Sequence, residues 1–347
     1  MALLHMDNFA FYGGPSNSRL TEGVYTIRGA SAGVSLPFDP DGVSGLRVVT
    51  VGSNAQLCKI LSSGKAKVFQ AFRLWTDVLP NTVGRLAGAI ALNGANQVLA
   101  GCGVDNLGRL GVATSAGVVD TTTTPVMTAN GWFHIEAMFE VVGATLNYEV
   151  RLEGRKVLEG STALPAGTSG PIWQCAYGWS GGAVSQFFHV KDSFICDDTG
   201  LTNNSFAGTV YVRTLPTVAD VVMDWEPVPA GATGSSILDN NPANNASYIR
   251  AIDPPPAPAV FELDNLPDDV TSVRGMMTYV RAAKVDGGDA TLQTGLVSGA
   301  STGLGADRPI TVAQTFWTDV FETDPATNDP WTPVAVDAAR LQINRTS

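Results

Sequence analysis

Two glutamates are the residues in this sequence that most resemble a catalytic pair. Glu136 and Glu140 are four positions apart in the stretch 132–141, and this spacing places both on one face of a β-strand. Glycosidases built on β-sandwiches hold two carboxylates so that one attacks or activates water and the other protonates the leaving sugar. Their usual pattern is E-x-D-x-x-E, and no aspartate lies between these two glutamates. We therefore expect structural roles for both glutamates, and no enzyme.

Three aromatic residues offer a second kind of chemistry, the stacking of a sugar ring. Trp173, Tyr177 and Trp179 lie in the segment PIWQCAYGWSGG. Flat side chains with one polar group are common in binding faces. The same residues, separated by small ones, suit a sandwich core or a contact between subunits equally well, and we favour that interpretation. They remain the candidate ligand-binding residues of this sequence.

Patterns for metal binding and nucleophilic catalysis are weak. The histidines His5, His134 and His189 have no second ligand-type residue at metal spacing. Oxygen-rich clusters at 39–42 and 197–204 suit calcium, but neither follows the twelve-residue calcium loop, so we interpret both as turns. We expect no nucleophile elbow, no phosphate-binding loop, no catalytic residue, no metal and no cofactor.

The cysteines also argue against a metal site. They are widely spaced, with no CxxC pair and no histidine cluster near them, at Cys58, Cys102, Cys175 and Cys196. We predict free, mostly buried thiols.

Charge and hydropathy exclude further classes of protein. The formal net charge is -11, so binding to nucleic acid or to an anionic membrane, which needs clustered Lys and Arg, is not expected. No apolar run reaches the length of a membrane-spanning helix, and residues 1–12 lack the basic start and long apolar stretch of a signal peptide. We expect the chain to be made and kept in a cytoplasm.

Hydrophobic alternation and turn residues predict an all-β chain. The 347 residues include 37 glycines and 20 prolines, which suits many short strands joined by tight turns. Residues 132–141 are apolar on both faces, as in a central strand of a two-layer sandwich. The expected strands of the first part are 3–12, 25–28, 45–51, 67–74, 85–92, 97–104, 110–113, 132–141, 147–152, 156–158 and 187–195. We expect the first and last of these to pair, with a bulge at Asp192-Ser193.

A chain of this length suits two domains, and we expect a second β domain with one short helix. Its strands are expected at 211–215, 247–252, 259–263 and 311–321, with a long loop over 227–245. The clearest hairpin joins 273–284 to 290–297 across Asp286-Gly287-Gly288-Asp289. The helix follows a Thr332 cap and Pro333, with Val334, Ala338 and Leu341 on one face.

The stretch 187–225 forms the seam between these domains and carries a specific resemblance. It resembles a family of tailed-bacteriophage virion proteins in which a concanavalin A-like sandwich ends in the strand and loop DD-F/Y-I/V-C-D-T-G-x-x-N-N-x-F-x-G. The matching residues are Asp192, Phe194, Ile195, Cys196, Asp197, Thr199, Gly200, Asn203, Asn204, Phe206, Gly208, Val210, Val212, Thr214, Leu215 and Pro216. Further matches are Trp225-Glu226-Pro227, 321–327 and Trp331-Thr332. The chain departs from the pattern at Lys191, where an acidic residue is usual, and at 254–256.

The resemblance implies both a fold and a role. The fold is a concanavalin A-like (jelly-roll) β-sandwich over 1–200, followed by a smaller β-sandwich domain over 201–347 that serves virion attachment or oligomerisation. The role is a bacteriophage virion structural protein, an external appendage of tail or collar such as a fibre, a spike or a baseplate-associated part. Its partners would be itself, as a homo-oligomer with a trimer as one option, and other virion proteins.

Two alternatives stay open. One is a capsid decoration protein. The other is a carbohydrate-binding adsorption module that takes host surface glycan through Trp173, Tyr177 and Trp179. In each case the expected location is the virion, after assembly in the host bacterial cytoplasm.

Overall fold

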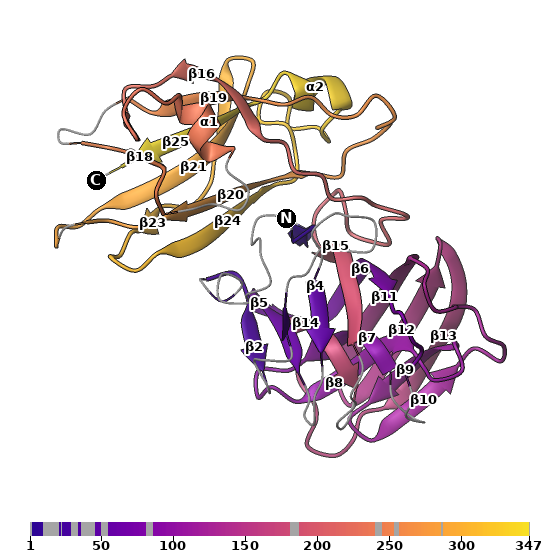
Figure 1. Cartoon of the computed structure of the whole chain (residues 1–347). Coiled ribbons are helices and arrows are strands. Elements are labelled where there is room, and N and C mark those ends of the chain that lie inside the picture. Colours follow the sequence, from indigo (N-terminus) through magenta and orange to yellow (C-terminus); the bar gives the residue numbers. More distant parts are fainter. Residues whose placement is uncertain are drawn as a thin grey trace. The chain divides into compact units, whose positions relative to one another are not determined.

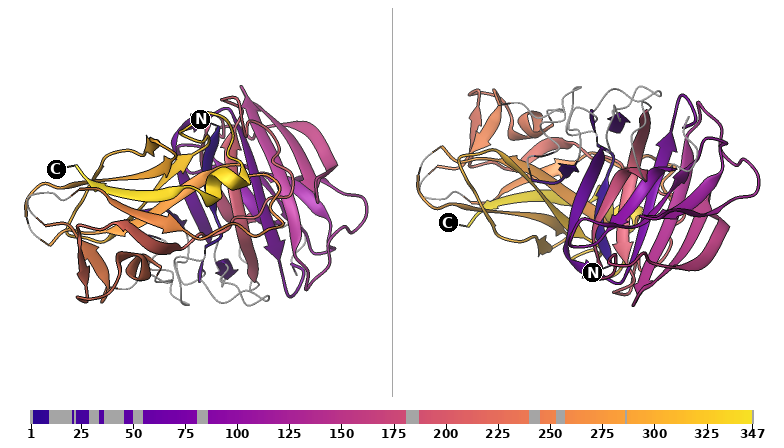
Figure 2. Two further views of the ribbon diagram at one scale, coloured as in Figure 1. Left: turned by 90° about the horizontal axis from the view of Figure 1, so that it is seen from above. Right: turned by 90° about the horizontal axis from the view of Figure 1, so that it is seen from below.

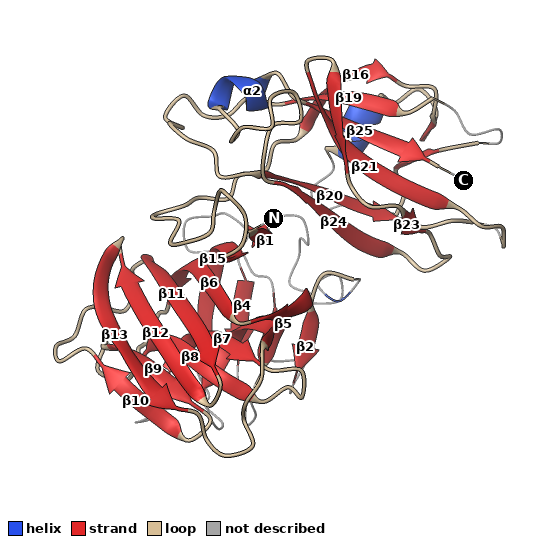
Figure 3. Ribbon diagram, turned by 180° about the vertical axis from the view of Figure 1, so that it is seen from behind, coloured by secondary structure: helices blue, strands red, loops and turns tan. Residues whose placement is uncertain are grey.

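The chain folds into two compact units, each built mainly of β-strands (Figures 1 and 3). The computed structural model describes residues 2–9, 21, 23–28, 34–35, 46–49, 55–80, 86–180, 187–239, 245–252, 257–285 and 287–346, and for 46–49, 179, 180 and 187 it describes the backbone only. The units divide between Val212 and Arg213, and Gly23 and Val24 belong to the second. The boundary expected from the sequence lay after residue 200, within a connector that the structure assigns to the first unit.

The first unit is a sandwich of two antiparallel sheets, coloured indigo to pink in Figure 2. The eight-stranded sheet, here sheet A, has the order β13-β12-β11-β6-β15-β4-β3, with β1 pairing to β15. Its strands are β1 (Leu3–Asp7), β3 (Val34–Ser35), β4 (Leu46–Val49), β6 (Lys67–Trp75), β11 (Phe133–Val142), β12 (Thr145–Leu152), β13 (Arg155–Ala163) and β15 (Phe187–Asp197).

The seven-stranded sheet, here sheet B, has the order β10-β9-β8-β7-β14-β5-β2. Its strands are β2 (Thr26–Arg28), β5 (Gln56–Lys65), β7 (Leu86–Leu92), β8 (Val98–Val104), β9 (Leu110–Thr114), β10 (Gly117–Thr121) and β14 (Ile172–Ser180). Of these, β5, β10 and β14 were not expected, because glycine and polar residues interrupt their alternation.

The core of the first unit lies between the two sheets. The ring of Phe72 on β6 lies 5.4 Å from the ring of Tyr177 on β14, and the Tyr177 hydroxyl lies 2.5 Å from Ser193 Oγ on β15. Phe72 and Tyr177 are at most 1% exposed. Since side chains alternate along a strand, the neighbours of Phe72, including Arg73, lie on the outer face of sheet A.

The predicted pairing of the first and last strands is confirmed. In the antiparallel pair β1 and β15, Met6 lies opposite Phe194 and Asp7 opposite Ser193. The predicted bulge is also present, because the register between β15 and β6 shifts between Lys191 and Phe194. These contacts close the sandwich on itself.

The second unit is a smaller β-sandwich. Its largest sheet has the order β16-β19-β25-β21-β22, with β23 pairing to β21, and two two-stranded sheets pair β17 with β18 and β20 with β24. The strands are β16 (Thr217–Val222), β17 (Glu226–Val228), β18 (Tyr248–Arg250), β19 (Ala259–Leu263), β20 (Met276–Ala282), β21 (Thr291–Ser298), β22 (Ser301–Leu304), β23 (Arg308–Pro309), β24 (Thr315–Phe321) and β25 (Arg340–Arg345).

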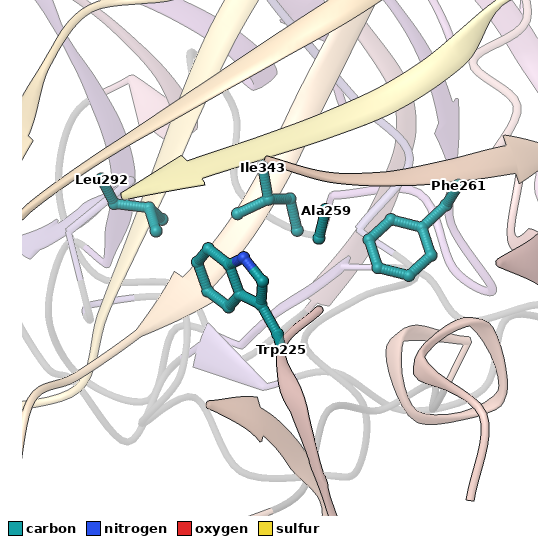
Figure 4. Close-up of a cluster of buried hydrophobic side chains, with 5 residues drawn as sticks. All are labelled: Trp225, Ala259, Phe261, Leu292 and Ile343. Atoms are coloured by element: carbon teal, nitrogen blue, oxygen red, sulfur yellow. The ribbon is translucent and has the colours of Figure 1, made fainter. Parts of the chain in front are cut away.

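Its core includes a cluster of five buried residues: Trp225, Ala259, Phe261, Leu292 and Ile343. In Figure 4 the indole of Trp225 lies beneath Leu292 and Ile343, with Phe261 to one side. The indole N–H of Trp225 donates to the carbonyl oxygen of Ala257 at 3.0 Å. This bond satisfies the polar atom of an otherwise apolar core residue.

A polar network joins the two layers of this unit. Asp319 on β24 accepts hydrogen bonds from Thr294 on β21 at 2.8 Å and from Arg308 at 2.7 Å. Thr278 on β20 lies 2.8 Å from Thr294, hydroxyl to hydroxyl. All but Arg308 are at most 9% exposed, so the network satisfies polar groups within the sandwich.

The expected hairpin of 273–284 with 290–297 is wrong. β20 pairs with β24, while β21 pairs with β25, β22 and β23 in the larger sheet. The connection carries the chain from one layer to the other, and at its start Lys284 N donates to the carbonyl oxygen of Thr311, which precedes β24. Turn residues alone do not distinguish this layer change from a hairpin within one sheet.

The C-terminal helix is confirmed, and its buried face was predicted wrongly. α2 (Pro333–Asp337) begins after Thr332, whose Oγ1 accepts from Ala335 N at 3.1 Å. Val336 is 1% exposed and Val334 is 78% exposed. The helix ends before the expected face is complete, because Leu341 already belongs to β25. The loop expected over 227–245 is also wrong in part, since it contains α1 (Gly234–Leu238) and the end of β17.

Candidate functional site

The seam residues hold a segment of irregular chain on the outer face of sheet A. We name residues 205–212 the strap. It contains no strand, so the strand expected at 211–215 is wrong, and the next strand begins at Thr217. Each end of the strap is tied to the sandwich by side chains of the motif.

The strap ends at Val212, whose backbone is bonded on both sides. Its N–H donates to Asp192 Oδ1 at 3.0 Å, and its carbonyl oxygen accepts from Asn8 Nδ2 at 3.2 Å. Asp192 has φ of +53°, a conformation that aspartate tolerates better than most residues. The bulge in β15 therefore aims the Asp192 carboxylate at the strap.

The middle of the strap packs on aromatic and cationic side chains. The ring of Phe206 lies 5.1 Å from the ring of Phe69, edge to face, and the Arg151 guanidinium lies 3.8 Å from its centroid. Cys196 Sγ donates to the carbonyl oxygen of Ser205 at 3.5 Å. Phe206 and Cys196 both match the virion-protein pattern that the sequence resembles, and both hold the strap on the sandwich.

The two glutamates have structural partners. Glu136 is 2% exposed, and its Oε1 accepts from the N–H of Gly208 in the strap at 2.9 Å. Glu140 forms an ion pair with Lys67 at 2.9 Å and accepts from Asn147, and these contacts lower its pKa. Both lie on the same face of β11, as predicted. Sequence reasoning had no signal for the Glu136 contact, because Gly208 is 72 residues away.

The three candidate aromatics do not form a common platform. Tyr177 is 1% exposed in the core, and Trp173 is 38% exposed. A Cβ added at Gly64 would lie 2.8 Å from Trp173 Nε1, and one at Gly94 would lie 3.2 Å from its Cδ1, so two glycines make room for the indole. The side chain of Trp179 lies outside the described residues.

A buried polar cluster joins β1 to the residue before β2. The Tyr25 hydroxyl donates to Asp7 Oδ2 at 3.0 Å and lies 2.8 Å from His5 Nε2, while Phe9 N donates to Asp7 Oδ1 at 2.6 Å. All these side chains are at most 4% exposed. Burial raises the pKa of Asp7 to about 7 and, helped by the charge of Lys59, lowers the pKa of His5. The sequence alone does not bring these residues together.

His5 and His189 lie apart although their strands pair. His5 is opposite Ile195, whereas His189 is opposite Trp75 and packs on that ring at 4.9 Å. Within the described part of the chain, no group of three or more His, Cys, Asp or Glu residues could hold a metal ion. The Asp39 to Gly42 cluster lies outside the described residues.

The four cysteines are free and buried, as predicted. Burial raises the pKa of Cys58 to about 11 and that of Cys102 to about 12. It raises the pKa of Cys175 further. Because the thiolate is the reactive form, these thiols are poor nucleophiles.

The pattern G-x-S-x-G does occur three times, contrary to the expectation that it has no counterpart in the chain. The copy at 29–33 lies in a part of the chain that the structure does not describe. The copy at 178–182 begins in β14, and its last two residues lie outside the described residues. In the third copy, Gly299 to Gly303, Ser301 begins β22 directly opposite Ser298 of β21. A nucleophile elbow lies between a strand and a helix, so this third copy is a hairpin turn.

The C-terminal motif residues also act as structural ties. Trp331 is 3% exposed and its indole N–H donates to Phe321 O at 3.0 Å. Asp324 Oδ1 accepts from Ala326 N at 2.9 Å, and its carbonyl oxygen accepts from Asn328 N at 2.8 Å. The motif therefore builds a compact loop before α2.

The described helices include none long and apolar enough to cross a membrane. No family model matches the chain, and no curated protein matches it.

Several solved structures are similar to part of the chain. One is the receptor-binding domain of a botulinum neurotoxin C/D mosaic serotype, with 8% identity, a TM-score of 0.37, and coverage of 56% of this chain and 48% of that one. Another is Trypanosoma rangeli sialidase, with 14% identity, a TM-score of 0.37, and coverage of 56% and 30%. A third is the T. cruzi calreticulin globular domain, with 12% identity, a TM-score of 0.34, and coverage of 56% and 87%.

The chain thus spans less than half the length of the neurotoxin domain and of the sialidase. Likenesses this weak carry no argument about activity or ligand. The class of the protein follows from its own sheets: an all-β chain with a sandwich of two antiparallel sheets, followed by a smaller β-sandwich with a short C-terminal helix.

Proposed function

We propose that this protein is a structural part of a bacteriophage virion, an external appendage of the tail or collar that self-associates and docks on the particle. Its work is mechanical and adhesive, without catalysis. The proposal is carried by the contacts that residues of the seam, 187–225, make in the structure. Asp192, Cys196, Phe206 and Gly208, which match the virion-protein pattern, all make contacts that tie the strap to the sandwich.

An exposed apolar edge strand supports self-association. β16 ends the largest sheet of the second unit, and Val218, Val221 and Val222 on it are 52%, 39% and 37% exposed. Asp220, the acidic residue of β16, does not protect the edge from pairing with another strand. Its carboxylate is turned to the backbone and accepts hydrogen bonds from the N–H groups of Gly234 and Ser235. Exposed, uncharged edge strands invite another strand to pair with them. We infer that a second copy of the chain covers this edge.

Mass photometry of the purified chain tests the proposal. The monomer mass is 36.3 kDa, and we expect a dimer, trimer or larger species at micromolar concentration. Val221→Lys should shift the population toward monomer by placing a charge on the edge. The matched control is Val334→Lys, which changes an exposed valine on α2 and should leave the assembly intact. A wild-type chain that stays monomeric would contradict self-association.

A glycan-adsorption module is the second candidate, favoured by the partial exposure of Trp173. If it is correct, the chain binds polysaccharide extracted from the host surface, and Trp173→Ala weakens that binding at least tenfold. Tyr177→Phe, which alters a buried ring, should leave it unchanged. Binding that survives Trp173→Ala would remove this residue from the candidate site.

A further inference from the structure

Arg73 has an unusual environment on the outer face of sheet A. Its guanidinium carbon lies 5.8 Å from the ring centroid of Trp132 and 5.2 Å from that of Tyr211. His134 and Lys191 are its direct partners on the two neighbouring strands, so all three side chains share this face. A guanidinium carries five N–H donors. In the described part of the chain, none of these donors makes a hydrogen bond or an ion pair.

The neighbours of Arg73 also have polar atoms without partners. His134 is 1% exposed, and neither of its ring nitrogens has a hydrogen-bond partner among the described residues. The same holds for Trp132 Nε1, which is buried. Such groups are usually satisfied by protein, water or a ligand. Burial and the charge of Arg73 lower the pKa of His134 to about 4, against the opposing effect of Glu153.

The acidic groups nearby are directed at the main chain. Glu136 Oε1 accepts from Gly208 N, and Glu153 Oε1 accepts from the backbone N–H of His134 at 2.8 Å. A second cation is close, because Lys191 Nζ lies 4.1 Å from the centroid of the Trp132 ring. This face therefore offers N–H donors and positive charge together, and an anionic acceptor would satisfy both.

We propose that Arg73, Trp132, His134 and Tyr211 form a binding site for a carboxylate carried on a sugar ring. A carboxylate matches the fork of a guanidinium with two parallel hydrogen bonds. Tyr211 is 53% exposed, so the site is open on the strap side, and its ring with that of Trp132 offers apolar surface to a sugar. This site is independent of the proposed virion role, so a result that contradicts one of the two proposals leaves the other unaffected.

The test is titration of the full-length chain with D-glucuronate, followed by the indole N–H signals in a proton–nitrogen correlation spectrum. Trp132→Phe identifies the Trp132 signal among the seven tryptophans. We expect this signal to move and to saturate with D-glucuronate, to move less with acetate at equal concentration, and not to move with D-glucose. Arg73→Gln should weaken the binding at least tenfold, and Arg73→Lys should weaken it several-fold by removing the fork.

The control variant is Arg155→Gln, which changes an exposed arginine on β13 and should bind as the wild type does. The wild-type comparison of the three ligands needs no variant, so a folding defect in Arg73→Gln would not obscure the answer. The proposal is overturned if D-glucuronate causes no saturable change, if D-glucose or acetate acts equally well, or if a folded Arg73→Gln binds like the wild type.

Discussion

Glu136 shows how one carboxylate can fasten a distant segment. Its Oε1 receives the N–H of Gly208, and Gly208 adopts φ of +76°, which favours glycine. Glu136→Ala would leave that N–H without its partner beneath the strap. We expect a loss of about 1 to 3 kcal/mol in the free energy of unfolding, measured by urea denaturation.

The matched variant is Glu136→Gln, which keeps an oxygen that can accept from Gly208. It should cost less than Glu136→Ala by about 1 kcal/mol. Equal losses for the two variants would show that the charge of Glu136, and not its bond to the strap, stabilises the fold.

Asp7 and His5 should give opposite pH dependences. Because the folded pKa of Asp7 is raised from 3.8 to about 7, its contribution to stability is present at low pH and is lost as pH rises from about 4 to about 7. The pKa of His5 is lowered, so its contribution is lost as pH falls below about 6.5. Between pH 4 and 6.5 the ionisation of Asp7 lowers the free energy of unfolding as pH rises, whereas the ionisation of His5 raises it.

Asp7→Asn removes the contribution of Asp7 to the pH dependence of the free energy of unfolding. Relative to the wild type, the free energy of unfolding of the variant should rise by about 1.4 kcal/mol per pH unit between pH 4 and 7. Urea denaturation at pH 4.5, 5.5 and 6.5 measures the difference. A constant difference across this range would mean that Asp7 has an ordinary pKa in the folded protein.

At the scale of the element, α2 offers two valines in contrasting environments. Val336 is 1% exposed and packs in a cluster with Leu296, Phe321, Trp331 and Ala339, whereas Val334 is 78% exposed. Val336→Ala should lower the free energy of unfolding by about 2 kcal/mol through lost burial and a residual cavity. Val334→Ala on the same helix should change it by less than about 0.5 kcal/mol. Thermal unfolding of both variants tests this prediction. Equal shifts in the unfolding temperature of Val336→Ala and Val334→Ala would contradict the packing described.

Local signals predicted elements better than pairings. The cap at Thr332 and the proline after it located α2, because both act within a few residues. The partner of β20 could not be found in this way, since it depends on packing between layers and on contacts with β24 some 40 residues later. The buried face of α2 was missed because the helix is only one and a half turns long and its packing is set by Trp331 and Phe321.

At the scale of the whole molecule, the two units have separate cores. Tyr177 belongs to the first unit and Val336 to the second. Tyr177→Phe, which removes the hydroxyl bonded to Ser193, should cost about 1 kcal/mol. Combined with Val336→Ala, the losses should add within about 0.5 kcal/mol, because residues without shared partners act independently. Denaturant unfolding of the two single variants and the double variant tests this, and a larger deviation would indicate coupling between the units.

The same holds for the candidate sites: features within one strand could be predicted from the sequence, and features that join several segments could not. Alternation in the sequence was enough to place Glu136 and Glu140 on one face, since it is a property of a single strand. The cluster of Arg73, Trp132, His134 and Tyr211 draws on β6, β11 and the strap, so only the register between strands assembles it. The sequence signal that could have pointed to it is Lys191, a basic residue where the family pattern has an acidic one.

The strap also determines how the protein responds to tension. A pull on the chain at Arg213 reaches Val212 first, and both backbone groups of Val212 are bonded, to Asp192 and to Asn8. These bonds pass the force sideways to Asp192 and Asn8, and they must break, followed by the bond from Gly208 to Glu136, before the pull along the chain reaches the C-terminal end of β15 at Asp197. The strap thus protects the first sandwich when the chain that leaves it at Arg213 is pulled.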